Sequence, residues 1–174
     1  LTELGYELHG SALAITRYVR NAWLWDRVRV QGGAYGAFVL LDRISGVLTL
    51  VSYRDPNLVQ TLDIFDRSAQ FLEEETLSKD ELTKSIIGAI GDLDSHMLPD
   101  TRGFVSMIRY LTNDTENLRQ QMREELLGTT TSHFKAMGRM LKAVADQGVV
   151  KVLGSPTAME AVEKERPNWL KRVK

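Results

Sequence analysis

Apolar residues recur along the chain at spacings that change from helical to strand-like and back to helical. In residues 11–24 they lie three or four positions apart, which predicts a helix with one buried face. The positions that form this face are Ala12, Ile15, Val19, Ala22 and Trp23. Ser11 is the expected N-cap, because its hydroxyl can accept a hydrogen bond from a backbone N–H of the first turn.

Two β-rich runs follow this helix. They predict a glycine turn and an antiparallel hairpin in residues 31–54. Both faces of the first run are apolar, because Phe38 and Leu40 alternate with Val39 and Leu41. We expect such a strand to lie inside a sheet that is covered on both sides, or to be covered by helices and another domain.

A block of helices is predicted over residues 56–147, where apolar stripes alternate with capping residues and glycines. A short buried strand at 149–153 and a short helix with a tail at 156–174 complete the pattern. Together these elements predict one α+β domain over residues 1–174, with an antiparallel sheet and helices packed on one face. The length is sufficient for such a domain to bury its own core.

The composition narrows the possible partners. The 22 basic and 23 acidic residues give a net charge of -1, which offers no electrostatic basis for binding nucleic acid or an anionic membrane. No run approaches the roughly 18 apolar residues of a membrane span. The chain has no cysteine, so disulfides, thiolate metal sites and cysteine nucleophiles are excluded. It begins with Leu1 and shows no signal peptide, so we expect it to be part of a longer protein.

The most unusual segment is 26–36, which holds three glycines within five residues. Arg29 carries a permanent positive charge on a planar fork of donors, and Tyr35 carries a hydroxyl on a rigid ring. Together they could hold a carbonyl oxygen or a developing oxyanion. The alternative interpretation is structural: the glycines form a helix-to-strand turn, Arg29 pairs with Asp26 or another carboxylate, and Tyr35 packs in the core.

A second cluster resembles a metal site in composition. Its members are Asp92, Asp94, His96 and Asp100. The zinc pattern of two histidines flanking a glutamate is absent, and no two of the three histidines are close in sequence. We therefore expect a helix end with solvated carboxylates, and no metal ligand in this chain.

Several blocks of the sequence resemble the C-terminal region of the presequence protease family, a branch of the pitrilysin- and insulinase-like zinc peptidases. The blocks are residues 25–36, 52–58, 86–94 and 98–100. They occur in the right order over nearly the whole chain, which is more specific than any single motif. The resemblance implies an M16-type fold: the fourth of four homologous α+β domains that close as two halves around a chamber, with the opening strand missing before Leu1.

The resemblance also implies which residues act. The zinc and its glutamate base would lie on an H-x-x-E-H helix in the first domain, outside this chain. Arg29 and Tyr35 match an arginine and a tyrosine that the family's C-terminal half sends across the chamber, so their implied role is catalytic. They would bind the substrate backbone and stabilise the tetrahedral intermediate. Gly32, Gly33 and Ala34, which lie between them, would contribute to substrate binding.

The implied function is that of a zinc metalloendopeptidase that degrades unfolded peptides, such as cleaved targeting peptides. Its partners would be peptide substrates and the N-terminal catalytic half of the same polypeptide, with no nucleic acid and no membrane. The protein would be soluble: cytoplasmic in a bacterium, and in the mitochondrial matrix or plastid stroma of a eukaryote. By itself the chain should neither bind zinc nor cleave peptides. Two alternatives stay open: a non-catalytic structural or interaction subunit of the same fold, and an unrelated helical binding module that uses the hairpin edge.

Overall fold

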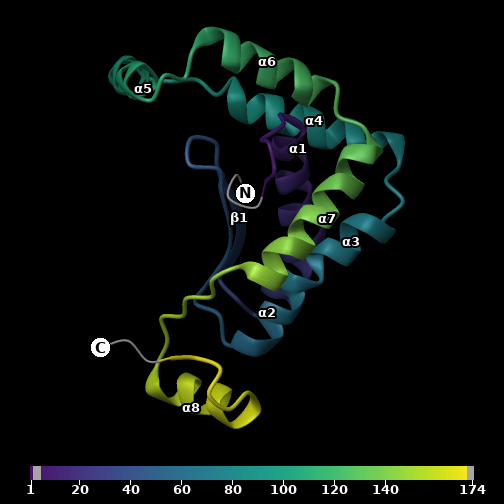
Figure 1. Cartoon of the computed structure of the whole chain (residues 1–174), viewed down its shortest axis with the longest axis vertical. Coiled ribbons are helices and arrows are strands. Elements are labelled where there is room, and N and C mark those ends of the chain that lie inside the picture. Colours follow the sequence, from purple (N-terminus) through teal and green to yellow (C-terminus); the bar gives the residue numbers. More distant parts are fainter. Residues whose placement is uncertain (2–4, 172–174) are drawn as a thin grey trace.

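The computed structural model describes residue 1 and residues 5–171 (Figure 1). Within these residues most of the fold is helical, and the sheet is a two-stranded antiparallel hairpin. The expected α+β class is confirmed in this coarse form. Helix α5 projects at one end of the molecule and helix α8 at the other, with the hairpin and the main core between them (Figure 1).

The first helix changes its winding along its length. It starts as α1, Ser11–Tyr18, and continues without a break into the π-helix η2, Val19–Gln31. The buried residues of η2 are four or five positions apart, as its wider turn requires: Val19, Trp23, Leu24 and Val28. The helix therefore runs past residue 24, where the prediction ended it. Ala22, predicted on the buried face, is exposed because the wider turn rotates it toward solvent.

The hairpin pairs β1, Gly36–Asp42, with β2, Val47–Tyr53, from Gly36 opposite Tyr53 to Asp42 opposite Val47. Its inner face contributes Val39, Leu48 and Leu50 to the core. On its outer face Phe38 and Leu40 are exposed. The expected cover on both sides is therefore not found among the described residues, since the helices cover one face of the hairpin.

Side-chain caps mark the start of several of the remaining helices. Ser78 forms a capping box with Glu81, and the Thr115 hydroxyl accepts a hydrogen bond from the Leu118 N–H. The helices are α2 (Leu58–Asp66), α3 (Ser68–Glu74), α4 (Lys79–Leu93), α5 (Pro99–Leu111), α6 (Glu116–Leu127), α7 (Thr131–Gln147) and α8 (Pro156–Glu165).

The predicted strand at 149–153 is wrong. This segment is irregular, and Val149 and Leu153 are exposed. An apolar run becomes a strand only when another strand pairs with it, and no described strand lies beside this one. The tail is irregular as far as residue 171, and residues 172–174 lie outside the described part of the chain.

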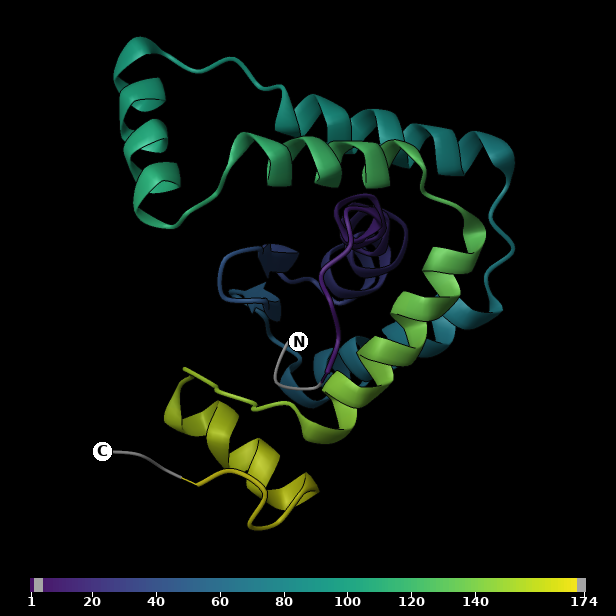
Figure 2. The same ribbon diagram turned by 45° about the horizontal axis from the view of Figure 1, so that its top comes forward.

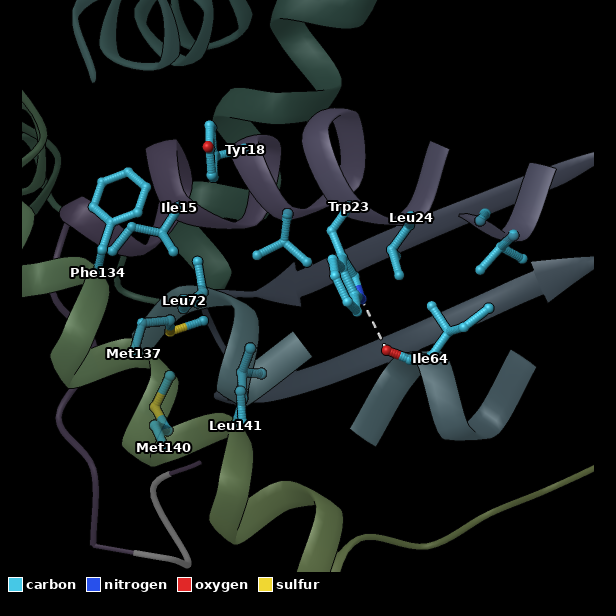
Figure 3. Packing of buried hydrophobic residues seen from close by; sticks show 14 of the residues in the cluster. Ile15, Tyr18, Trp23, Leu24, Ile64, Leu72, Phe134, Met137, Met140 and Leu141 are labelled. Atoms are coloured by element: carbon cyan, nitrogen blue, oxygen red, sulfur yellow. Dashed lines mark hydrogen bonds between the residues drawn. The ribbon is translucent and has the colours of Figure 1, made fainter. Parts of the chain in front are cut away.

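The main core forms where η2, α3 and α7 meet the inner face of the hairpin (Figure 3). Trp23 is central to it: its ring stacks on Phe71 at 4.8 Å, and its indole N–H donates to the Ile64 carbonyl at 2.8 Å. A smaller cluster of Ala14, Ala89 and Leu126 joins α1 to α4 and α6, which lie side by side (Figure 2). Both clusters pack against the first helix, so its last turn is held in place.

Candidate functional site

The glycine segment forms a rigid cap on η2. Gly33 has a φ of 76°, in the left-handed region that favours glycine. Its N–H donates to the Arg29 carbonyl at 3.0 Å, and the Ala34 N–H donates to the Val28 carbonyl at 3.1 Å. These bonds satisfy carbonyl groups that a helix end leaves unpaired. Arg29 therefore lies on the last turn of the helix, where its backbone is fixed.

The Arg29 side chain stacks on a neighbouring indole. Its guanidinium carbon lies 4.0 Å from the centre of the Trp25 ring, which is 48% exposed. The structural interpretation paired Arg29 with Asp26 or another carboxylate. Asp26 instead accepts a hydrogen bond from the Gln31 amide at 2.6 Å. Arg29 makes no ion pair with any described residue.

Tyr35 lies at the entrance to β1, and its side chain is 65% exposed. It therefore does not pack in the core of the described residues, as the structural interpretation expected. Its backbone N–H is shared between the carbonyls of Tyr53 and Arg54, at 3.1 and 3.3 Å. Its ring meets the Tyr53 ring edge to face at 5.8 Å. Tyr35 is thus held by its backbone while its hydroxyl faces outward.

Gly32, Gly33 and Ala34, the three residues before Tyr35, take part in the cap directly. A Cβ at Gly32 would lie 2.6 Å from the Val28 carbonyl oxygen, so a larger residue cannot be placed there without a shift of the backbone. The Gly32 carbonyl accepts a hydrogen bond from the Asn57 side-chain amide. Ala34 is buried, and the N–H groups of Gly33 and Ala34 are both used within the cap. Any contact of this segment with a peptide must therefore use other atoms than these two donors.

Sequence reasoning did not select Arg54 as a functional residue. Its guanidinium carbon lies 5.7 Å from the centre of the Tyr35 ring and 5.4 Å from that of Tyr53. Its only signal in the sequence is its place in the block 52–58. The hairpin brings that block back beside Tyr35, which local patterns cannot reveal.

Of the four residues in the acidic cluster, Asp92 and Asp94 form ion pairs. Asp92 pairs with Arg17, and Asp94 binds Arg123 through two hydrogen bonds of 2.6 and 2.7 Å. The hydrogen bonds and charge of Arg123 hold the pKa of Asp94 below its usual range. In residues 1 and 5–171 no group of three histidine, aspartate or glutamate side chains is arranged to hold a metal ion. Nor does any helix there combine the length and apolar character needed to cross a membrane.

Comparison with known proteins assigns the family. The family model "PreP C-terminal domain" matches residues 1–155. The chain is 47% identical over 165 residues to "Presequence protease 1, chloroplastic/mitochondrial" of Arabidopsis thaliana, covering 95% of this chain and 15% of that protein. It is 33% identical over 151 residues to "Protein HypA" of Clostridium perfringens, covering 87% and 15%. It is 26% identical over 169 residues to "Presequence protease, mitochondrial" of Mus musculus, covering 93% and 15%.

The chain thus spans about 15% of the length of each of these curated relatives. The blocks that carried the resemblance, including the cap that presents Arg29 and Tyr35, lie within the matched residues. Since the family model covers most of the sequence, the chain belongs to the family of presequence protease C-terminal domains.

Proposed function

We propose that this chain is the non-metal C-terminal part of a zinc metalloendopeptidase, in which Arg29 and Tyr35 act on the peptide substrate. The observation that carries the proposal is that both side chains are available to bind a ligand. Arg29 has no carboxylate partner among the described residues, and Tyr35 is exposed although its backbone N–H is bonded to the carbonyls of Tyr53 and Arg54. Exposed functional groups on a rigid support are what a binding site requires.

The two residues would act on the oxygen atoms of a peptide bond. The Arg29 guanidinium offers N–H donors in a plane that Trp25 holds from one face. The Tyr35 hydroxyl is a second donor. Both would bind the substrate backbone and stabilise the negative charge that develops on the carbonyl oxygen in the tetrahedral intermediate. Gly32, Gly33 and Ala34 would support this binding by fixing the spacing between the two donors.

The metal belongs to another part of the parent protein in this proposal. By the family resemblance, its ligands would lie on an H-x-x-E-H helix in the N-terminal half. When bound there, zinc supplies an activated water for hydrolysis. The chain would then be the fourth domain of a two-half chamber. A strand from elsewhere in the polypeptide could pair with the hairpin, since β1 and β2 each have a free edge among the described residues.

The proposed substrates are unfolded peptides small enough to enter such a chamber, such as cleaved targeting peptides. Relatives from Arabidopsis thaliana and Mus musculus carry the name presequence protease and the designation chloroplastic or mitochondrial. For a eukaryotic source we therefore propose the mitochondrial matrix or plastid stroma, and for a bacterial source the cytoplasm.

The test is substitution in the full-length protease. Arg29→Ala should lower kcat by roughly 10²–10³-fold, as loss of one oxyanion donor does, and Tyr35→Phe should lower it through loss of the hydroxyl. Zinc content and thermal stability should stay unchanged. Arg139→Ala on α7 and Tyr110→Phe on α5 are matched controls, because both side chains are exposed. Loss of zinc, or activity equal to that of the controls, would instead favour a structural role or a non-catalytic subunit.

A further inference from the structure

Arg54 adopts a backbone conformation that a long side chain rarely takes. Its φ is 48°, in the left-handed region, and the other described non-glycine residues with positive φ are Asn113 and Asn168. Asparagine tolerates this region, whereas for arginine, which has a Cβ and a long side chain, it is strained. Residues kept in such conformations are concentrated at functional sites, where the surrounding structure holds them.

The surroundings of Arg54 fix it beside Tyr35. The carbonyls of Tyr53 and Arg54 both accept from the Tyr35 N–H. On the other side, the Asp55 carboxylate accepts from the Asn57 N–H at 2.8 Å, and the Asn57 amide donates to the Gly32 carbonyl. The turn after β2 is thus bonded to both ends of the glycine cap. This places the Arg54 side chain on the same surface as the proposed site.

The Arg54 guanidinium has aromatic neighbours and no carboxylate. It lies over the exposed rings of Tyr35 and Tyr53, and it makes no ion pair with any residue that the structure describes. Since its guanidinium is in no ion pair among the described residues, its N–H donors are available for a planar acceptor.

We propose that Arg54, supported by Tyr53, binds a carboxylate of the peptide substrate, either its C-terminal carboxylate or an acidic side chain. This inference rests on the proposed function, because it places the peptide against Tyr35. A carboxylate matches the fork of guanidinium donors with two parallel hydrogen bonds. Arg29 stacks on a different residue, Trp25, and in this proposal the two arginines have different roles. Arg54 is a positioning residue that orients the peptide, and it does not act on the scissile bond.

The experiment uses the full-length protease and four fluorogenic peptides that share one scissile sequence. They combine a free or amidated C-terminus with a glutamate or glutamine at one position. The wild type should have a higher kcat/KM for the peptide that carries the recognised carboxylate than for its neutral counterpart. In Arg54→Gln this ratio of the two kcat/KM values should fall about tenfold, mainly through KM. Arg54→Lys should keep part of the preference. The arm that loses its preference identifies the C-terminus or the acidic side chain as the ligand.

Three further variants make the result decisive. Arg54→Gly relieves the positive φ, so it should fold at least as stably as the wild type and still lose the preference. Arg139→Gln removes the same charge from an exposed position on α7 and should keep the preference. Arg29→Ala should lower kcat for all four peptides alike and so reports on the proposed function separately. An unchanged preference in Arg54→Gln and Arg54→Gly, or an equal loss on all four peptides, would overturn the inference.

Discussion

The guanidinium carbon of Arg29 lies 4.0 Å from the centre of the Trp25 ring, four residues earlier on η2. In a π-helix, residues four or five positions apart share a face, so the winding of η2 itself brings the pair together. A cation over an indole is attracted by the ring's quadrupole, and the stacking limits the directions in which the guanidinium can point. We therefore expect the exposed Trp25 to orient the Arg29 guanidinium, a role that core packing does not explain.

Trp25→Ala should lower kcat/KM of the full-length protease about two- to fivefold, because an exposed cation–π contact contributes roughly 0.5–1 kcal/mol. Trp25→Phe should lose less. The melting temperature should change little, since the ring is half exposed. Trp169→Ala is the matched control, because Trp169 stacks with Arg166 at 5.1 Å outside the site. Equal effects of both alanine variants would contradict the role given to Trp25.

Gly33→Ala should destabilise the chain by about 1–2 kcal/mol, because a φ of 76° is costly for any residue with a Cβ. Gly91→Ala is the matched control, for which we expect the opposite effect. A Cβ at Gly91, inside α4, would meet no atom within 4 Å, so this variant should gain about 0.5–1 kcal/mol from helix propensity. Urea unfolding of the two variants measures both changes in the free energy of unfolding. A neutral Gly33→Ala would mean that the cap is less rigid than its hydrogen bonds indicate.

Stability should decrease as the pH falls below about 6.5 because of His133. Burial and the neighbouring His9 ring, 4.7 Å away, lower the pKa of His133, so the unfolded chain takes up the proton first. The stabilising effect is present above the unfolded pKa and is lost as the pH falls through the lower folded pKa. The neutral ring accepts the Thr130 N–H at 3.0 Å, a bond that protonation breaks.

His133→Gln separates this titration from the cap. Glutamine at this position can complete a capping box with Thr130 and carries no charge. Unfolding free energies measured between pH 8 and pH 5 should vary less in this variant than in the wild type. If both proteins show the same pH dependence, other groups are responsible.

The isolated chain should not cleave a fluorogenic peptide in the presence of zinc, because the proposed ligands and general base lie in the N-terminal half. The measurement compares the chain with the full-length protease at equal concentration, each with and without a chelator. Cleavage by the chain that the chelator abolishes would show that the metal site had been assigned to the wrong part of the protein.

Local signals in the sequence were sufficient for much of the helical block. The capping residues Ser78 and Thr115 act on N–H groups three positions away, so their effect does not depend on the rest of the fold. The strand expected at 149–153 failed for the opposite reason. A strand needs a partner that its own sequence does not contain.

What the sequence determined by itself was the family, the glycine cap and the two candidate residues Arg29 and Tyr35, because these depend on the order of residues in short blocks. Only the three-dimensional structure decided that η2 winds as a π-helix with Arg29 on Trp25, that Tyr35 is exposed and that Arg54 lies beside it. The stacking of Arg29 on Trp25 is a contact within one helix and follows from its winding. The contact between Tyr35 and Arg54 depends on where β2 returns, which is set by pairing between residues far apart in the chain and which no local pattern encodes.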